Sequence, residues 1–139
     1  MKKHVMTFIG ALSLLLAAGS AFAQTINLKA GIPFDFVVNE TTLQAGEYQL
    51  VSSGIDGSVL LIRDADGHGR GFILTNSAES GRPCDQTKLV FLRYGDQYFL
   101  SEIWREGDTS GHQVPKSRRQ TEMAQDFISQ QVLLMAQLK

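Results

Sequence analysis

The segment KLVFLRYGDQYFLSEIW, residues Lys88–Trp104, decides the fold class of this chain of 139 residues. Two aromatic-rich runs flank Gly95-Asp96, and a tight two-residue turn that contains glycine is typical of a β-hairpin. Paired positions must be equidistant from the turn, which predicts the pairs Tyr94 with Gln97, Arg93 with Tyr98, Leu92 with Phe99 and Phe91 with Leu100. Both faces of this hairpin carry apolar side chains, so we expect both to be covered.

The hairpin also supplies aromatic and cationic side chains. One predicted face holds Phe91, Arg93, Tyr98, Leu100, Glu102 and Trp104, and the other holds Leu92, Phe99 and Ile103. A cross-strand contact of Arg93 on Tyr98 at the margin of a sheet is the ordinary interpretation of the polar members. A ligand site is the alternative, and its candidate residues in the hairpin are Arg93, Tyr94, Tyr98 and Trp104.

Most of residues 24–115 also have the pattern of β-structure. From Gln24 onward, apolar and polar side chains alternate with a period of two, as they do in strands. The run Val59–Ile62 is continuously apolar, which is typical of a strand covered on both faces. The polar segments Asn76–Thr87 and Glu106–Gly111 predict loops. We expect one mainly β domain, a sandwich or small partly open barrel of about seven or eight antiparallel strands.

The last part of the chain, residues 116–139, predicts a helix that packs on the β domain. Ser117 and Gln120 have the spacing of a capping box, so the helix should run from about Arg118 to Leu138. At 3.6 residues per turn one arc collects Met123, Ala124, Phe127, Ile128, Leu134, Met135 and Leu138. A dimer seam or a membrane-surface helix would show a similar arc, and both stay open as alternatives.

Residues 1–23 have the pattern of a signal peptide of bacterial type. Lys2 and Lys3 precede an apolar run over residues 5–18, and the small-residue triplet Ala21-Phe22-Ala23 follows. We expect cleavage between Ala23 and Gln24 and export to the periplasm or the medium. The apolar run is too short for a stable transmembrane span.

Charge and cysteine content narrow the classes of partner. Without residues 1–23, 11 lysine and arginine residues stand against 14 aspartate and glutamate residues, which leaves a net charge of −3. This acidic balance argues against a nucleic-acid partner. Cys84 is the only cysteine, so it cannot form an internal disulfide, and a homodimer through Cys84 or through the helix is left open.

Motifs for catalysis, metals and cofactors are weak throughout the chain. The turn Asp64–Gly69 does not fit an EF-hand calcium loop, because His68 falls at an oxygen-ligand position, and a plain hairpin turn explains it better. Cys84, His68 and His112 lack zinc-ligand spacing. A pair of Cys84 as nucleophile and His112 as base would need a third orienting group. We therefore predict no catalytic residue, metal or cofactor. Lys116, Arg118 and Arg119 form a basic cluster at the predicted helix start, a candidate site for an anion.

Four segments of the chain resemble an uncharacterised family of small exported bacterial proteins. The resemblance rests on the segments Ile32–Asn39, Leu43–Tyr48, Leu89–Leu100 and Val114–Arg118. It implies no activity. The stretch Leu43–Tyr48 also resembles the strand entry of transthyretin-like and carboxypeptidase-regulatory-like sandwich modules.

The sequence as a whole favours an exported, non-catalytic module that binds a protein, a glycan or another envelope component. A small extracytoplasmic hydrolase is the first alternative, and it would need a pocket with at least two converging polar groups. A structural protein that dimerises through the C-terminal helix is the second alternative.

Overall fold

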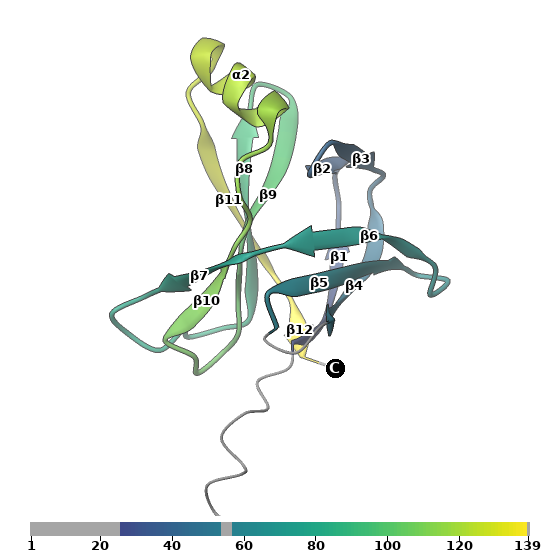
Figure 1. Cartoon of the computed structure of the whole chain (residues 1–139), viewed down its shortest axis with the longest axis vertical. Helices are drawn as coiled ribbons and strands as arrows, with labels where there is room; N and C mark the ends of the chain where they lie inside the picture. Colours follow the sequence, from purple (N-terminus) through teal and green to yellow (C-terminus); the bar gives the residue numbers. More distant parts are fainter. Residues whose placement is uncertain (1–25, 54–56, 139) are drawn as a thin grey trace, which may run out of the picture.

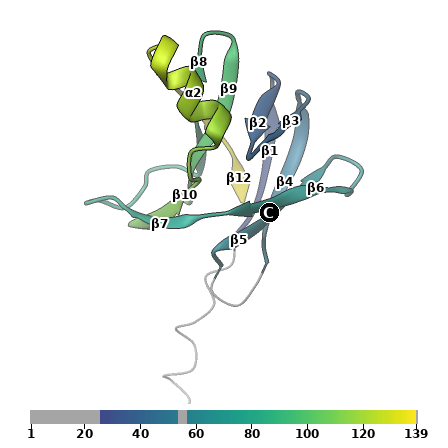
Figure 2. The same cartoon turned by 45° about the horizontal axis from the view of Figure 1, so that its top comes forward.

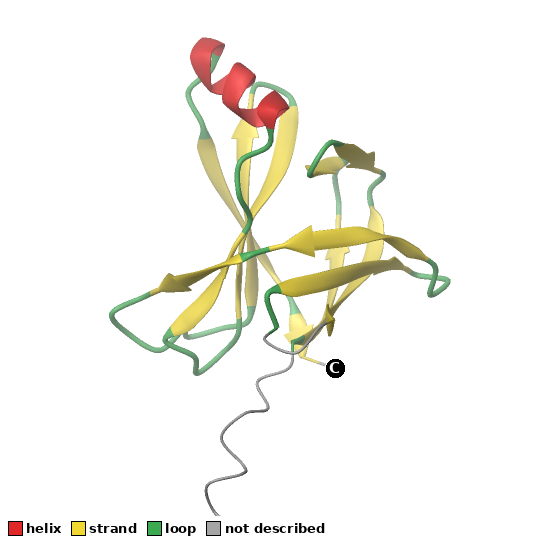
Figure 3. Ribbon diagram, in the orientation of Figure 1, coloured by secondary structure: helices red, strands yellow, loops and turns green. Residues whose placement is uncertain are grey.

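The computed structural model describes residues 26–53 and 57–138, and the predicted signal peptide and cleavage site lie outside them. The described residues form twelve strands and one helix, arranged as two sheets that do not close into a barrel (Figure 1; Figure 3). The expectation of a mainly β fold of the sandwich type is confirmed. The strands are more numerous than the seven or eight expected, since several are short and polar.

The first sheet has five strands in the order β12-β1-β4-β5-β6. Their bounds are Gln137–Leu138 for β12, Asn27–Ile32 for β1, Gly46–Ser53 for β4, Val59–Asp64 for β5 and Gly69–Leu74 for β6. All four pairings in this sheet are antiparallel. Alternate side chains of β1, β4 and β5 point inward, and Leu28, Leu50 and Leu60 are almost fully buried there.

The second sheet follows the order β11-β8-β9-β10-β7, and β2 and β3 lie off this path. The bounds are Gln130–Met135 for β11, Lys88–Tyr94 for β8, Gln97–Trp104 for β9, Ser110–Gln113 for β10, Asn76–Glu79 for β7, Phe36–Val38 for β2 and Thr41–Leu43 for β3. Strand β2 joins β9 in parallel, which is the one parallel pairing among the described strands.

Two strand paths connect the sheets directly. Strand β6 ends at Leu74 and β7 begins at Asn76, so Thr75 alone separates a strand of the first sheet from a strand of the second. Ala136 separates β11 from β12 in the same way. Figure 1 shows β6 and β7 as one nearly continuous path across the molecule. At each of these two crossings, a strand of the first sheet and a strand of the second sheet lie end to end.

The predicted β8–β9 hairpin is confirmed in its turn and in its first four pairs. Gly95 has a φ of 59°, a left-handed conformation that glycine adopts without steric cost. The register then shifts between Val90 and Phe91, so Ser101 has no partner residue across the hairpin. The prediction that Ile103 shares a face with Phe99 is wrong, because this bulge turns Ile103 into the main core instead.

The main core lies between the two sheets, and a smaller one lies outside the second sheet. Phe36, Phe91 and Ile103 are among the fully buried side chains of the main core. The smaller core consists of Val37, Tyr94 and Phe99, with Leu92 and Met123 packed against it. Met123 belongs to the helix α2, which lies over the tip of β8 and β9 (Figure 2).

Helix α2 spans Arg118–Asp126 and begins where the capping pattern predicts. The Ser117 hydroxyl accepts a hydrogen bond from the backbone N of Gln120 at 3.2 Å. The Gln120 side chain does not complete the box, because its Nε2 donates instead to the Tyr94 hydroxyl at 3.4 Å. The first half of the predicted capping box is therefore present, and the second half is replaced by a contact to the hairpin.

The prediction that the helix continues to about Leu138 is wrong. Phe127 has an extended backbone with a φ of −129°, and β11 and β12 follow. Val132 and Leu134 alternate toward the core opposite Phe91 and Leu89 of β8. The arc of apolar residues expected on one helix face does not exist, because residues 130–135 and 137–138 are strand. The domain division at residue 116 also loses its basis, since β11 is an integral strand of the second sheet.

Candidate functional site

Polar strands meet at one corner of the sandwich. Strand β7 and the first two residues of β10 occupy segments that the sequence predicts as loops. The pairing of β7 with β10 sets His112 opposite Ser77. On its other side His112 lies opposite Ile103, a residue of the main core, so the His112 side chain is on the core-facing side. Polar side chains thus replace apolar ones at this end of the sandwich interior.

These side chains line a cavity, here called the corner pocket, of about 190 Å³. Its walls are Ile26, Ser58, Thr75, Ser77, Ile103, Arg105, Asp108, Ser110, Gly111 and His112. Ile26 and Ser58 flank the first sheet, and the other residues belong to the second sheet, its β9–β10 turn or the Thr75 crossing. The pocket therefore exists only because the two sheets meet here.

A short hydrogen-bond chain fixes the imidazole in the corner pocket. The Thr75 hydroxyl lies 3.0 Å from the carbonyl oxygen of Ser58 and 2.9 Å from Nδ1 of His112. A hydroxyl has one proton, and the carbonyl can only accept, so Thr75 donates to Ser58. His112 must then donate its Nδ1 proton to Thr75. In the neutral ring this assignment leaves the lone pair on Nε2, and Nε2 can therefore accept a hydrogen bond from a ligand.

The imidazole is held in its neutral form. Burial lowers the pKa of His112 below its usual value, and the neighbouring Arg105 guanidinium lowers it further. The Asp108 carboxylate acts in the opposite direction but does not cancel these two effects. At neutral pH the corner pocket therefore contains a neutral imidazole with one fixed donor and one acceptor.

An ion pair forms another wall of the corner pocket. Nε of Arg105 lies 2.8 Å from Oδ2 of Asp108, and the two side chains are only 21% and 23% exposed. The turn that carries them is held from outside, because the Cys84 backbone N donates to the Asp108 carbonyl at 3.0 Å. The wall charges balance, so the pocket offers both hydrogen-bond donors and acceptors without a net charge.

Of the four hairpin residues predicted as ligand contacts, Arg93 and Tyr98 contact each other, and Tyr94 and Trp104 lie apart from them. Arg93 lies over the Tyr98 ring with its guanidinium carbon 5.5 Å from the ring centre, and its Nε donates to the Gly95 carbonyl at 2.8 Å. The ordinary interpretation of this pair as a cross-strand contact is confirmed. Tyr94 is 2% exposed and belongs to the smaller core beneath α2. These three side chains take part in packing.

Trp104 lies elsewhere, on the outer side of the second sheet. Its Nε1 donates to Oε2 of Glu102 at 3.0 Å, and the ring is 7% exposed because it packs flat against Gly111. Trp104 and Glu102 line an outer groove of about 470 Å³ together with Lys88, Leu133, Met135 and residues 80 and 82–86. A ring buried to this extent offers little surface for stacking.

The predicted basic cluster at the start of α2 is spread over separate partners. Arg118 is highly exposed and pairs with Glu122 at 3.2 Å along the helix. Arg119 turns toward β3 and donates to the Thr42 hydroxyl at 3.3 Å. Lys116 is exposed. The three cations do not converge on one point where an anion could sit.

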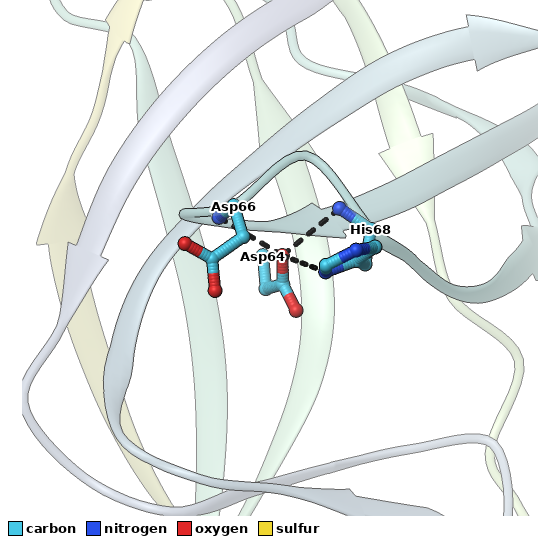
Figure 4. A group of neighbouring side chains, drawn as sticks. All are labelled: Asp64, Asp66 and His68. Atoms are coloured by element: carbon cyan, nitrogen blue, oxygen red, sulfur yellow. Dashed lines mark hydrogen bonds and ion pairs between the residues drawn. The ribbon is translucent and has the colours of Figure 1, made fainter.

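Asp64, Asp66 and His68 gather in the β5–β6 turn, with ligand-type atoms within 4.8 Å of one another (Figure 4). The Asp64 carboxylate accepts from the backbone N of Asp66 at 3.0 Å and of His68 at 2.9 Å. Its other oxygen lies 2.7 Å from the Arg70 guanidinium. The interpretation of this segment as a hairpin turn is confirmed, and the carboxylate is engaged by the turn itself.

Sequence reasoning considered His112 only as a partner of Cys84 and missed the other polar residues of the corner pocket. Cys84 lines the outer groove and not the corner pocket, so the predicted alternative of a Cys84 and His112 pair has no geometric basis. A usable pattern was present: Thr75 and Ser77 alternate with a period of two, as do Ser110 and His112. An alternation of polar residues is a weak signal for a site, because exposed strands and loops show the same pattern.

The fold and the site together define a two-sheet β protein with a neutral, polar corner pocket. The chain matches no known family model, and comparisons with curated proteins and with solved structures gave no significant match. Within the described ranges, none of the helical structure is long and apolar enough to cross a membrane.

Proposed function

We propose that this chain is an exported, non-catalytic binding module whose corner pocket holds a small, uncharged, polyhydroxylated group, such as one sugar unit of an envelope glycan. The observation that carries the proposal is the convergence of the His112 and Thr75 pair with the Arg105 and Asp108 ion pair in one cavity. Fixed donors and acceptors of this kind give a site its orientation and specificity.

Size and charge favour such a ligand. The corner pocket, at about 190 Å³, is smaller than the roughly 300–1,000 Å³ of pockets for drug-sized ligands, so it suits one small group. Its balanced charges offer no net attraction to an anion or a cation.

The hydrogen bonds of the imidazole favour binding over catalysis. Nδ1 of His112 bonds the Thr75 hydroxyl, whereas a catalytic base is usually oriented by a carboxylate and contacts a nucleophile. The hydrolase alternative retains one supporting feature, the lone pair on Nε2.

Calorimetric titration of the purified protein with neutral monosaccharides tests this proposal. We expect one sugar to bind, and to add about 2.7 kcal/mol to folded-state stability at a hundredfold excess over its dissociation constant. The variant His112→Phe should lose binding, and the matched control Arg93→Ala, outside the pocket, should retain it. Binding that survives His112→Phe, or a flat response to every neutral sugar, would overturn the proposal. Release of acid from ester substrates that is lost in His112→Phe would establish the hydrolase instead.

Export has its own test. Expression of the full chain in a bacterium, followed by N-terminal sequencing of the mature protein, should give a first residue of Gln24 in the periplasmic fraction or the medium. An intact Met1 in the cytoplasmic fraction would contradict export.

A further inference from the structure

The first sheet has an open edge along β6. Among the described strands, β6 pairs only with β5 in this sheet and stands last in the strand order. Its sequence, GRGFIL, contains neither lysine nor proline, the residues with which natural proteins often protect such edges. Its one charged side chain, Arg70, is held by Asp64. The strand itself therefore carries neither of these two barriers to pairing with another strand.

One hydrogen bond shows which backbone groups of β6 point toward β5 and which point toward the edge. The backbone N of Thr75 donates to the Ser58 carbonyl at 2.8 Å, on the β5 side. Backbone groups of alternate residues in a strand point the same way, so those of Ile73 also face β5. The groups of Phe72 and Leu74 must then point away from β5, along the open edge.

The same two residues form an apolar surface on the outer face. Phe72 is 59% exposed and Leu74 is 65% exposed. The register sets Phe72 beside Leu61 and Leu74 beside Val59, with Val51 next to Leu61 on β4. These five residues form one apolar patch that begins on β4 and ends at the open edge. Farther from the edge the same face is polar, with Gln49 hydrogen-bonded to Asn27 at 2.8 Å.

We propose that a second copy of this chain pairs antiparallel with β6, so that the two five-stranded sheets become one sheet of ten strands. A two-fold axis perpendicular to the sheet keeps both outer faces on the same side. Residues directly opposite each other on the two β6 strands must have side chains on the same side of the sheet. One residue of β6 must therefore lie opposite the same residue of the second copy, at the axis. An axis at Ile73 sets Phe72 of each copy opposite Leu74 of the other.

This register satisfies both the backbone and the side chains. The Phe72 and Leu74 amides and carbonyls, which point along the edge, exchange hydrogen bonds with their counterparts in the second copy. The two apolar patches join into one, centred on the axis. Each copy supplies both members of the pair, and this self-complementarity favours a second copy over an unrelated partner.

Asn39 controls access to this edge. Its Nδ2 donates to the Phe72 carbonyl at 2.9 Å, and the residue holds a φ of 55° in the β2–β3 turn. The dimer needs that carbonyl as the acceptor for Leu74 of the second copy. Asn39 therefore competes with dimerisation, and its removal should strengthen the dimer.

Sedimentation equilibrium of the purified protein over a range of concentrations tests the proposal. We expect a monomer–dimer equilibrium that Leu74→Lys weakens at least tenfold, since it sets two charges beside the axis. The matched control Leu133→Lys changes a leucine of similar exposure, 51%, on β11 and should leave the equilibrium unchanged. Asn39→Gly keeps the left-handed backbone and should tighten the dimer roughly tenfold, because one side-chain hydrogen bond per copy no longer competes.

Hydrogen exchange locates the interface directly. The amides of Phe72 and Leu74 should exchange quickly in dilute protein and become protected as the concentration rises. A protein that stays monomeric at all concentrations would overturn the proposal. A dimer that leaves these two amides unprotected, that Leu133→Lys disrupts, or that thiol reduction dissolves would also overturn it, in favour of the outer groove or Cys84.

Discussion

Replacing Thr75 with valine keeps the shape of the side chain and removes the hydroxyl that links the two sheets at the corner pocket. Thr75 is 8% exposed, and its hydroxyl bonds both the Ser58 carbonyl and His112. The Ser58 carbonyl retains the backbone N of Thr75 at 2.8 Å, so it is not left without a partner. The Nδ1 proton of His112 does lose its acceptor. With about 1 kcal/mol for each hydrogen bond, we expect a loss of about 1–2 kcal/mol in the free energy of unfolding.

Urea unfolding of four proteins measures this link: the wild type, Thr75→Val, His112→Phe and the double variant. With a denaturant slope of about 2 kcal/mol per molar, the midpoint of Thr75→Val should fall by roughly 0.5–1 M. The double variant should show a coupling of about 0.5–1.5 kcal/mol. The control is Thr87→Val, because Thr87 is 5% exposed and bonds the Glu106 backbone N at 3.0 Å outside the pocket. Thr87→Val should be additive with His112→Phe. A Thr75 and His112 coupling within about 0.3 kcal/mol of zero would refute the hydrogen-bond assignment.

Three further outcomes follow from the fold. Gly111→Ala should cost about 1–3 kcal/mol in urea unfolding, because the added Cβ would lie 2.6 Å from the Trp104 ring. In the control Gly31→Ala the added Cβ meets nothing within 4 Å, so no such clash is expected. Equal losses of stability in the two variants would contradict this packing. The pKa of His112 is lower in the folded state than in the unfolded state, where it is about 6.5. The contribution of His112 to stability is therefore complete above pH 6.5 and is lost as the pH falls below that value. Between pH 7 and 5 His112→Phe should lose less stability than the wild type, and parallel stability profiles would contradict the assignment. Deletion after Asp126 removes β11 and β12 and should abolish the cooperative unfolding transition seen by circular dichroism; a folded product would show that these strands are dispensable.

The parts of the fold that sequence predicted correctly depend on neighbours along the chain. The β8–β9 turn follows from a glycine that accepts a left-handed backbone, and the start of α2 follows from one serine hydroxyl that caps it. The bulge at Ser101 was not predictable from the spacing of apolar residues alone. The bulge places Ile103 in the main core, and that core contains residues from both sheets.

The C-terminal segment shows how tertiary structure chooses between two local patterns. Residues 130–135 fit an apolar arc at 3.6 residues per turn, and they also fit an alternation of two with Val132 and Leu134 inward. The edge of β8 offers this segment backbone partners and the main core offers it apolar surface, whereas a solitary helix would pair its own backbone but bury no apolar surface. The same reasoning applies to β7 and β10, two polar strands stabilised by each other.

The sequence by itself determined the mainly β class, the central hairpin with its turn, and the residue at which the helix begins, because each depends on side chains a few positions apart. Only the tertiary structure decided where the helix ends, which polar residues form the corner pocket, and that β6 stands at the edge of its sheet. Those features join residues from distant segments, such as Ser58, Thr75 and His112, whose hydrogen bonds exist only once the two sheets have met.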